Sequence, residues 1–176
     1  VLKEIGFASS GAGTRAAGLE VLMSTMQSWG VPIDGVTLVD GSGLSDDDRM
    51  TCASLLAVLQ HGSVADAVGQ GLAIGGTPGT TLYDAFLTGE PLSGIIRAKT
   101  GTLNNLADGT TPDGKPAAKA LSGFVPTEGG GVIEFSLLLN GQTISDPAIY
   151  KPIWLAMAEI FADYPSGPTA ADLGPR

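Results

Sequence analysis

The sequence has few of the residues that often announce a function. It contains one cysteine, Cys52, and one histidine, His61, so it can form neither an internal disulfide nor a Cys/His metal cluster. Nine basic residues are spread thinly among eighteen acidic ones, which gives a net charge of −9. Without a basic stripe the chain is a poor match for nucleic acid or an anionic membrane surface. No apolar run is long enough to predict a membrane-spanning helix.

What is present is the composition of a globular domain. Hydrophobic residues make up 43% of the 176 positions and charged residues 15%, enough for one domain with its own core. We expect residues 1–163 to form that domain and the Pro/Gly/Ala-rich residues 164–176 to be a frayed tail. We expect Cys52 to be a buried thiol that packs as a small hydrophobic residue. His61, beside Gly62 at a helix end, is expected to be a surface charge partner and not a catalytic base.

The first half of the chain has helical spacing. Apolar residues recur at helical intervals over residues 16–29 and include Trp29, which we expect in the core, while Thr14 is the expected N-cap. A second helix is predicted with Ser45 as its cap and three aspartates, 46–48, in its first turn, where the helix dipole favours negative charge. A third, shorter helix is predicted over residues 64–70.

From residue 93 the pattern changes to strands. Residues 95–99, 118–125 and 132–139 are predicted strands that form an antiparallel meander. A helix over residues 147–162 follows, with an expected buried stripe of Ile153, Trp154, Met157, Ile160 and Phe161. The fold class is therefore α+β, an antiparallel sheet flanked by helices. In this arrangement the first strand has an unpaired edge, and such edges are usually covered, so we expect an upstream segment to complete the sheet.

The triplet Lys99-Thr100-Gly101 ends the first of these strands. Lys-Thr-Gly is one of the motifs that build the site of penicillin-binding proteins and serine β-lactamases. The companion motifs Ser-x-x-Lys, which carries the nucleophile, and Ser-x-Asn do not occur in this sequence. A lone Lys-Thr-Gly is a weak signal, and an exposed strand end turning into a loop is the plain alternative.

The residue types of the triplet suit acyl transfer. Lys99 supplies a fixed positive charge, and the Thr100 hydroxyl can bind a carboxylate oxygen. Gly101 lacks a side chain, so a substrate backbone can approach the strand closely. The backbone N–H of Thr102 then points to the place where the carbonyl oxygen develops charge. An extended peptide can also pair with the edge of this strand as an added strand.

The run Asp40-Gly41-Ser42-Gly43 is predicted to be a turn that follows a short β-branched strand at residues 36–39. Asp40 is expected to organise this turn behind the site, and Ser42 to support it as a turn residue and not as a nucleophile. The run is too short for a phosphate loop because no Gly-Lys-Ser/Thr follows it. The neighbouring aspartates are interpreted as a solvated helix turn and not as a metal site.

Four segments, in order, resemble the D-alanyl-D-alanine carboxypeptidase/endopeptidase family of low-molecular-mass (class C) penicillin-binding proteins. They are Val39-Asp40-Gly41-Ser42-Gly43-Leu44-Ser45, Leu72-Ala73-Ile74-Gly75-Gly76 with Gly79-Thr80, Arg97-Ala98-Lys99-Thr100-Gly101-Thr102-Leu103 and Ala120-Leu121-Ser122-Gly123-Phe124-Val125. The likeness covers roughly residues 1–162. It implies the C-terminal part of a β-lactamase/transpeptidase-like domain.

The resemblance also implies roles. Lys99 and Thr100 would bind the terminal D-Ala carboxylate of a peptidoglycan stem peptide, or that of a β-lactam. The Thr102 N–H would form the oxyanion hole with the N–H of the nucleophile, which would lie with Ser-x-x-Lys and Ser-x-Asn on an upstream segment, cut away or disordered before Val1. The reaction would be acyl transfer through a serine ester, without metal or cofactor, outside the cytoplasm of a bacterium.

The sequence departs from the family pattern at three places. Asp46 stands where the family usually has Arg, and Tyr83-Asp84-Ala85-Phe86 replaces a stretch that commonly holds another Arg. Residues 104–117 form an insertion that is expected to overhang the cleft or to be a tolerated surface loop.

Three alternative functions stay open. They are a related esterase or β-lactamase, a catalytically silent peptidoglycan-binding or scaffold domain, and an unrelated α/β binding domain with a chance Lys-Thr-Gly.

Overall fold

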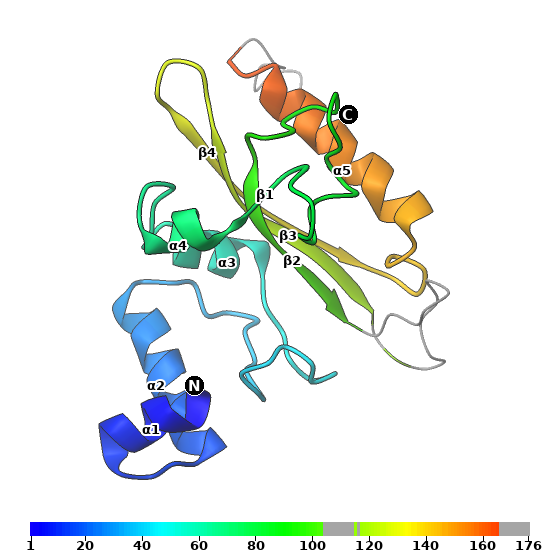
Figure 1. Ribbon diagram of the computed structural model, residues 1–176. Coiled ribbons are helices and arrows are strands. Elements are labelled where there is room, and N and C mark those ends of the chain that lie inside the picture. Colours follow the sequence, from blue (N-terminus) through cyan, green and yellow to red (C-terminus); the bar gives the residue numbers. More distant parts are fainter. Residues whose placement is uncertain (104–114, 116, 166–176) are drawn as a thin grey trace.

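The computed structural model describes residues 1–103, 115 and 117–165, so most of the predicted insertion and tail lies outside the described residues. The five helices are α1 (Leu2–Ser10), α2 (Arg15–Ser28), α3 (Cys52–Leu59), α4 (Ala67–Gly71) and α5 (Pro147–Ala162). The four strands are β1 (Ala73–Ile74), β2 (Arg97–Leu103), β3 (Ala118–Pro126) and β4 (Val132–Asn140). The α+β class is confirmed (Figure 1). No helix in the described part of the chain is long and apolar enough to span a bilayer.

The sheet has the order β1-β2-β3-β4, and every neighbouring pair is antiparallel. The predicted meander of β2, β3 and β4 is therefore confirmed. The prediction of a fully unpaired first edge is wrong, because β1 pairs with the start of β2 through Ala73↔Ala98 and Ile74↔Arg97. The two-residue strand β1 is too short to show a period in the sequence. Among the described residues the open edge of β2 begins at Lys99.

One face of the sheet packs against α5 (Figure 1). Side chains alternate between the two faces of a strand, and the residues that meet α5 are the alternate ones that include Ala98, Leu121 and Phe135. They enclose Trp154 and Ala158 of α5, which are 1% and 0% exposed. The opposite face carries Ser122 and Ser136, whose hydroxyls are 2.9 Å apart. This opposite face of the sheet lies on the side of the helices from the first half of the chain (Figure 1).

Three helix starts follow from local capping. The Thr14 hydroxyl accepts a hydrogen bond from the Ala17 N–H at 3.1 Å, as predicted. Helix α5 begins at Pro147 as predicted, with the Asp146 carboxylate accepting the Ala148 N–H at 2.8 Å. Helix α4 begins at Ala67, later than expected, because Asp66 caps it.

The second predicted helix begins in the wrong place. Helix α3 starts at Cys52, where Thr51 accepts the Ser54 N–H at 3.0 Å, and not after Ser45. The preceding residues are used otherwise. Arg49 exchanges backbone hydrogen bonds with Thr37, and this single bridge is all that remains of the strand predicted at residues 36–39. The three aspartates therefore lie in a loop.

Two predictions of burial are wrong. Cys52 is exposed and is the first residue of α3. Trp29 is 46% exposed because α2 ends just before it. Its ring stacks on His61 with centroids 4.4 Å apart, and the imidazole Nε2 lies 2.9 Å from the Trp29 carbonyl oxygen. His61 is thus a surface residue that caps the end of α2.

The buried stripe of α5 is narrower than predicted. Trp154 is buried as expected, but Ile153 and Ile160 are 39% and 51% exposed. Helix α5 lies on the sheet along one line of contact, so the residues next to that line face outward.

Candidate active site

The backbone of β2 presents polar groups at an open edge. The Gly75 N–H donates to the Ile96 carbonyl at 2.9 Å, so the peptide groups of Ile96 face β1. In an antiparallel strand every second residue directs its N–H and C=O to the same side. The N–H and C=O groups of Thr100 and Thr102 therefore point to the side of β1 but lie past its end. Among the described residues, no strand pairs with these backbone groups at the edge.

Lys99 lies at this edge. Its side chain leaves the strand on the face opposite α5, because it alternates with the buried Ala98. The exposed ammonium then turns back and donates to the Thr100 carbonyl at 2.6 Å. No carboxylate among the described residues forms an ion pair with it. The cation thus faces solvent beside the open edge.

The two threonine side chains point to the other face of the sheet. The Thr102 hydroxyl accepts a hydrogen bond from Lys119 Nζ at 2.8 Å, and Thr102 is paired with Lys119 in the strand register. Between the threonines, a Cβ added at Gly101 would lie 3.3 Å from Ala120 Cβ. The structure therefore brings the predicted residues 99–102 together along the edge but sends the Lys99 and Thr100 side chains out on opposite faces.

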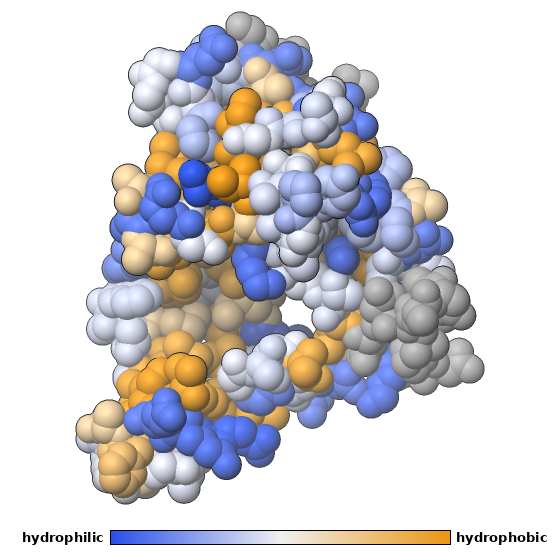
Figure 2. Space-filling view, in the orientation of Figure 1, coloured by the Kyte–Doolittle hydropathy of each residue, from blue (hydrophilic) through white to orange (hydrophobic). Residues whose placement is uncertain are grey.

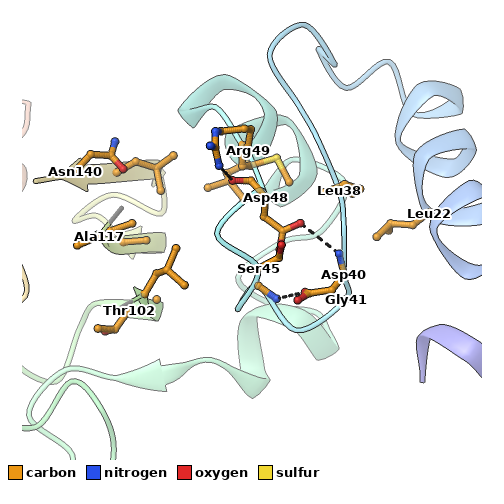
Figure 3. Close-up of a pocket in the computed structure, with 18 residues that line it drawn as sticks. Leu22, Leu38, Asp40, Gly41, Ser45, Asp48, Arg49, Thr102, Ala117 and Asn140 are labelled. Atoms are coloured by element: carbon orange, nitrogen blue, oxygen red, sulfur yellow. Dashed lines mark hydrogen bonds between the residues drawn. The ribbon is translucent and has the colours of Figure 1, made fainter. Parts of the chain in front are cut away.

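A cavity of about 600 Å³ lies on the face opposite α5 (Figure 3). Its walls come from β2, β3 and β4 on one side, and from α2, α3 and the loop at residues 38–50 on the other. Figure 2 shows the molecule hollowed between these parts, with hydrophobic residues bordering the hollow. The larger apolar residues that line it are Leu22, Leu38, Met50, Leu55, Leu103 and Leu138. Gly101 and Thr102 reach it from the edge strand.

The whole sequence was also compared with known families. The D-Ala-D-Ala carboxypeptidase 3 (S13) family matches over residues 1–164. The chain belongs to the S13 family. The resemblance seen in the four segments is thereby confirmed.

Curated relatives agree with this S13 membership. A D-alanyl-D-alanine carboxypeptidase of an Actinomadura species is 32% identical over 90% of this chain. Carboxypeptidase DacB of Mycolicibacterium smegmatis is 32% identical over 68%, and penicillin-sensitive carboxypeptidase A of Dictyostelium discoideum is 35% identical over 61%. The chain spans 28%, 25% and 21% of these relatives, about a quarter of their length.

In this S13-family chain Asp40 holds the turn that borders the cavity (Figure 3). Its carboxylate accepts the backbone N–H groups of Ser42 and Gly43 at 2.7 and 2.8 Å. Partial desolvation alone would raise the pKa of Asp40, but these hydrogen bonds together outweigh it and hold the pKa below the usual value. Ser42 stands in the same turn but does not line the cavity. Both residues occupy the turn that the sequence predicted.

Asp48 ties this turn to the following chain. Its Oδ1 accepts the Val39 N–H at 2.7 Å and the Asp40 N–H at 3.3 Å. Its Oδ2 is buried without a hydrogen-bond partner among the described residues. No group of three His, Cys, Asp or Glu residues in the described part of the chain could hold a metal ion.

An ion pair between Asp46 and Lys115 crosses from this loop to the segment before β3. The hydrogen bond and charge of Asp46 raise the pKa of Lys115. Asp46 follows the cavity-lining Ser45, and Lys115 lies two positions before the cavity-lining Ala117, so the pair links two walls of the cavity. No sequence pattern predicts this contact, since the two residues are 69 positions apart.

Sequence reasoning also missed Lys119. The alternation of β3 could have found it, because Lys119 shares a face with Leu121 and Val125, where an apolar residue is expected. A lysine on that face must direct its ammonium along the sheet surface toward a polar partner.

Proposed function

We propose that this chain supplies the Lys-Thr-Gly wall of a serine-type D-Ala-D-Ala carboxypeptidase that acts on peptidoglycan stem peptides. The observation that carries the proposal is the open edge of β2, where Lys99 and the backbone groups of Thr100 and Thr102 are all free of β1. Membership of the S13 family supports it, as do the activities named for the relatives. Because the chain spans a quarter of those relatives, the activity belongs to a longer protein.

In the proposed mechanism the substrate lies along the edge of β2 as an added strand. Lys99 leaves the Thr100 carbonyl and holds the terminal carboxylate, while the Thr100 hydroxyl lies on the opposite face of the sheet. The Thr102 N–H stabilises the oxyanion as a serine attacks the D-Ala–D-Ala amide. D-Ala leaves with the proton from the serine, and water hydrolyses the ester. No metal or cofactor takes part.

The nucleophile is proposed to come from a segment with Ser-x-x-Lys and Ser-x-Asn, upstream in the complete protein. The cavity supports this assignment. It is apolar, and on the side of the sheet its walls carry small residues such as Gly101, Ala118 and Ala120, which leave room for another element. The outer edge of β4 also has no strand partner among the described residues, and sheets rarely leave so long an edge bare. Peptidoglycan as substrate implies a location outside the cytoplasm.

The decisive experiment is fluorescent-penicillin labelling of the natively purified complete protein, read on a denaturing gel with mass analysis of each band. We expect label on the polypeptide that carries Ser-x-x-Lys. That polypeptide is either continuous with this chain or a separate piece that co-purifies with it. Label that is lost within seconds by hydrolysis would favour a β-lactamase or esterase. Absence of label would contradict the proposal and favour a silent peptidoglycan-binding domain.

Lys99→Ala tests the assignment of the clamp. Because a charge-assisted hydrogen bond is lost, we expect acylation by penicillin to slow by about 10²-fold while the fold stays intact, since Lys99 is exposed. Lys151→Ala on α5 is the matched control and should keep the wild-type rate. An unchanged rate for Lys99→Ala would overturn the role of Lys99.

A further inference from the structure

Lys119 of β3 lies between the end of β2 and helix α5. It stands directly opposite Thr102 in the sheet, and its Nζ donates to the Thr102 hydroxyl at 2.8 Å. The same ammonium lies 4.4 Å from the ring centroid of Tyr150 and 5.6 Å from that of Trp154. Thr102 is thus connected through one side chain to the most deeply buried aromatic residue of α5.

The ammonium is held there by more than the threonine. Burial lowers the pKa of Lys119, and no carboxylate in the described part of the chain forms an ion pair with it. The faces of two aromatic rings attract a cation and offset part of the lost hydration. Trp154 is 1% exposed, so its ring cannot move without disturbing the core. The amine is therefore anchored to a rigid part of the fold.

Thr102 needs such an anchor. It is the last residue but one of β2, beyond the part of the strand that β1 covers. Its own N–H and C=O face the open edge, so the sheet holds it only through the hydrogen bonds of its neighbours Gly101 and Leu103 with β3. The peptide plane that carries the Thr102 N–H is anchored on one side only, by the Gly101 carbonyl that faces β3, and the bond from Lys119 adds a restraint on the side chain of the same residue.

We propose that Lys119 is a positioning residue that fixes Thr102, so that the Thr102 N–H keeps a constant direction at the open edge. The inference rests on the proposed function, in which that N–H is a donor to the oxyanion. Lys119 itself touches no substrate, because it lies on the α5 face of the sheet and the cavity lies on the other. It acts on the transition state through Thr102 alone.

The test is a double-mutant cycle in the complete protein, with the binding of penicillin separated from the rate of acylation. Lys119→Met keeps the aliphatic stem over Tyr150 but removes the donor, and Thr102→Val keeps the backbone N–H but removes the acceptor. Outright loss of an oxyanion donor costs ~10²–10³-fold, so loss of its positioning should slow acylation by about 10-fold in each variant. Noncovalent binding should stay unchanged, since the contact acts in the transition state.

The two losses should not add, because both variants break the same hydrogen bond. Lys151→Met, the same change on the neighbouring helix α5, is the control and should keep the wild-type rate. If Lys119→Met fails to fold, Thr102→Val still tests the bond from its other end. The inference about Lys119 would be overturned by wild-type acylation rates in the variants, by additive losses, or by equal losses of binding and acylation. None of these three results would overturn the proposed function. A wild-type protein that penicillin does not acylate would overturn the proposed function, and this inference with it.

Discussion

The two faces of one sheet differ in how far the chain fills them. On the α5 face Ala98, Leu121 and Trp154 are at most 1% exposed and form a closed core. On the other face the same strands border a cavity of about 600 Å³. Because side chains alternate along a strand, stability and binding can be assigned to alternate residues of the same element. Strand β2 is therefore packed against the core on one face and borders the cavity on the other.

Trp154→Ala should have the largest effect on the closed face. Truncating a fully buried Trp leaves a cavity and should lower the free energy of unfolding by ~3–5 kcal/mol. Urea denaturation followed by circular dichroism measures the change. Ile153→Ala, at the neighbouring position that is 39% exposed, is the control and should cost about 1 kcal/mol or less. Equal effects at the two positions would contradict the packing of α5 described above.

Gly123→Ala should come next. A Cβ at this position would lie 2.0 Å from the Arg97 carbonyl oxygen and 2.7 Å from Ala98 Cα, so β2 and β3 would have to separate. We expect the free energy of unfolding to fall by about 3 kcal/mol. Gly71→Ala is the control, because a Cβ there meets nothing within 4 Å and alanine favours the helix. A small effect of Gly123→Ala on the free energy of unfolding would mean that β2 and β3 can move apart at little cost.

A matched pair of alanines compares the two faces directly. Ala98→Leu enlarges a residue in the closed core and should cost ~1–3 kcal/mol in urea denaturation. Ala120→Leu enlarges a residue that lines the cavity and should leave the stability of this chain unchanged or raise it by about 1 kcal/mol. In the complete protein the same Ala120→Leu change should impair penicillin labelling, since it fills space proposed for the upstream segment. Equal destabilisation by both changes would mean that the cavity face is as closed as the other.

The smallest effect is expected at the turn on the rim of the cavity. The Asp40 carboxyl has a lowered pKa in the folded protein, so its charge stabilises the fold at pH values above the usual value of 3.8. This contribution is lost as the pH falls through the lower, folded pKa. The difference in stability between wild type and Asp40→Ala should therefore be largest at neutral pH and shrink below about pH 4. Urea denaturation at pH 7 and pH 3 measures it, and a difference that grows in acid would contradict the role of the carboxylate.

Much of the fold could be predicted wherever local signals agreed with packing. Pro147 predicted the start of α5, and Thr14 predicted that of α2, because both signals act within the first turn of the helix. The meander followed from the alternation and glycine turns of three strands. The start of α3 was predicted wrongly because it depends on contacts between separate segments. Asp48 and Arg49 bond to the loop before them, so the helix begins after Thr51 and not after Ser45.

The candidate site was predictable only in part. The motif located the edge strand, and Asp40 was found from its turn. The burial of Trp29 was predicted wrongly because helical spacing does not tell which turn of a helix extends beyond its neighbours. The burial of Cys52 was predicted from the usual behaviour of a lone cysteine, which does not apply to the exposed first residue of α3. The Asp46–Lys115 pair was missed because it joins segments far apart in the chain, and a single sequence carries no signal for such a contact. Lys119 was overlooked although the alternation of β3 indicates a lysine on the apolar face.

The length of β1 also determines how much of β2 is left unpaired at this edge. Since β1 pairs only with Arg97 and Ala98, the edge left open in the described part of β2 runs from Lys99 to Leu103. At ~3.3 Å per residue that stretch is about 16 Å long, room for a segment of four or five residues. Lengthening β1 by two pairs would cover Thr100 with protein. The point at which β1 stops therefore determines how much of the described edge of β2 stays unpaired, and with it the length of the segment that the proposed function would place there.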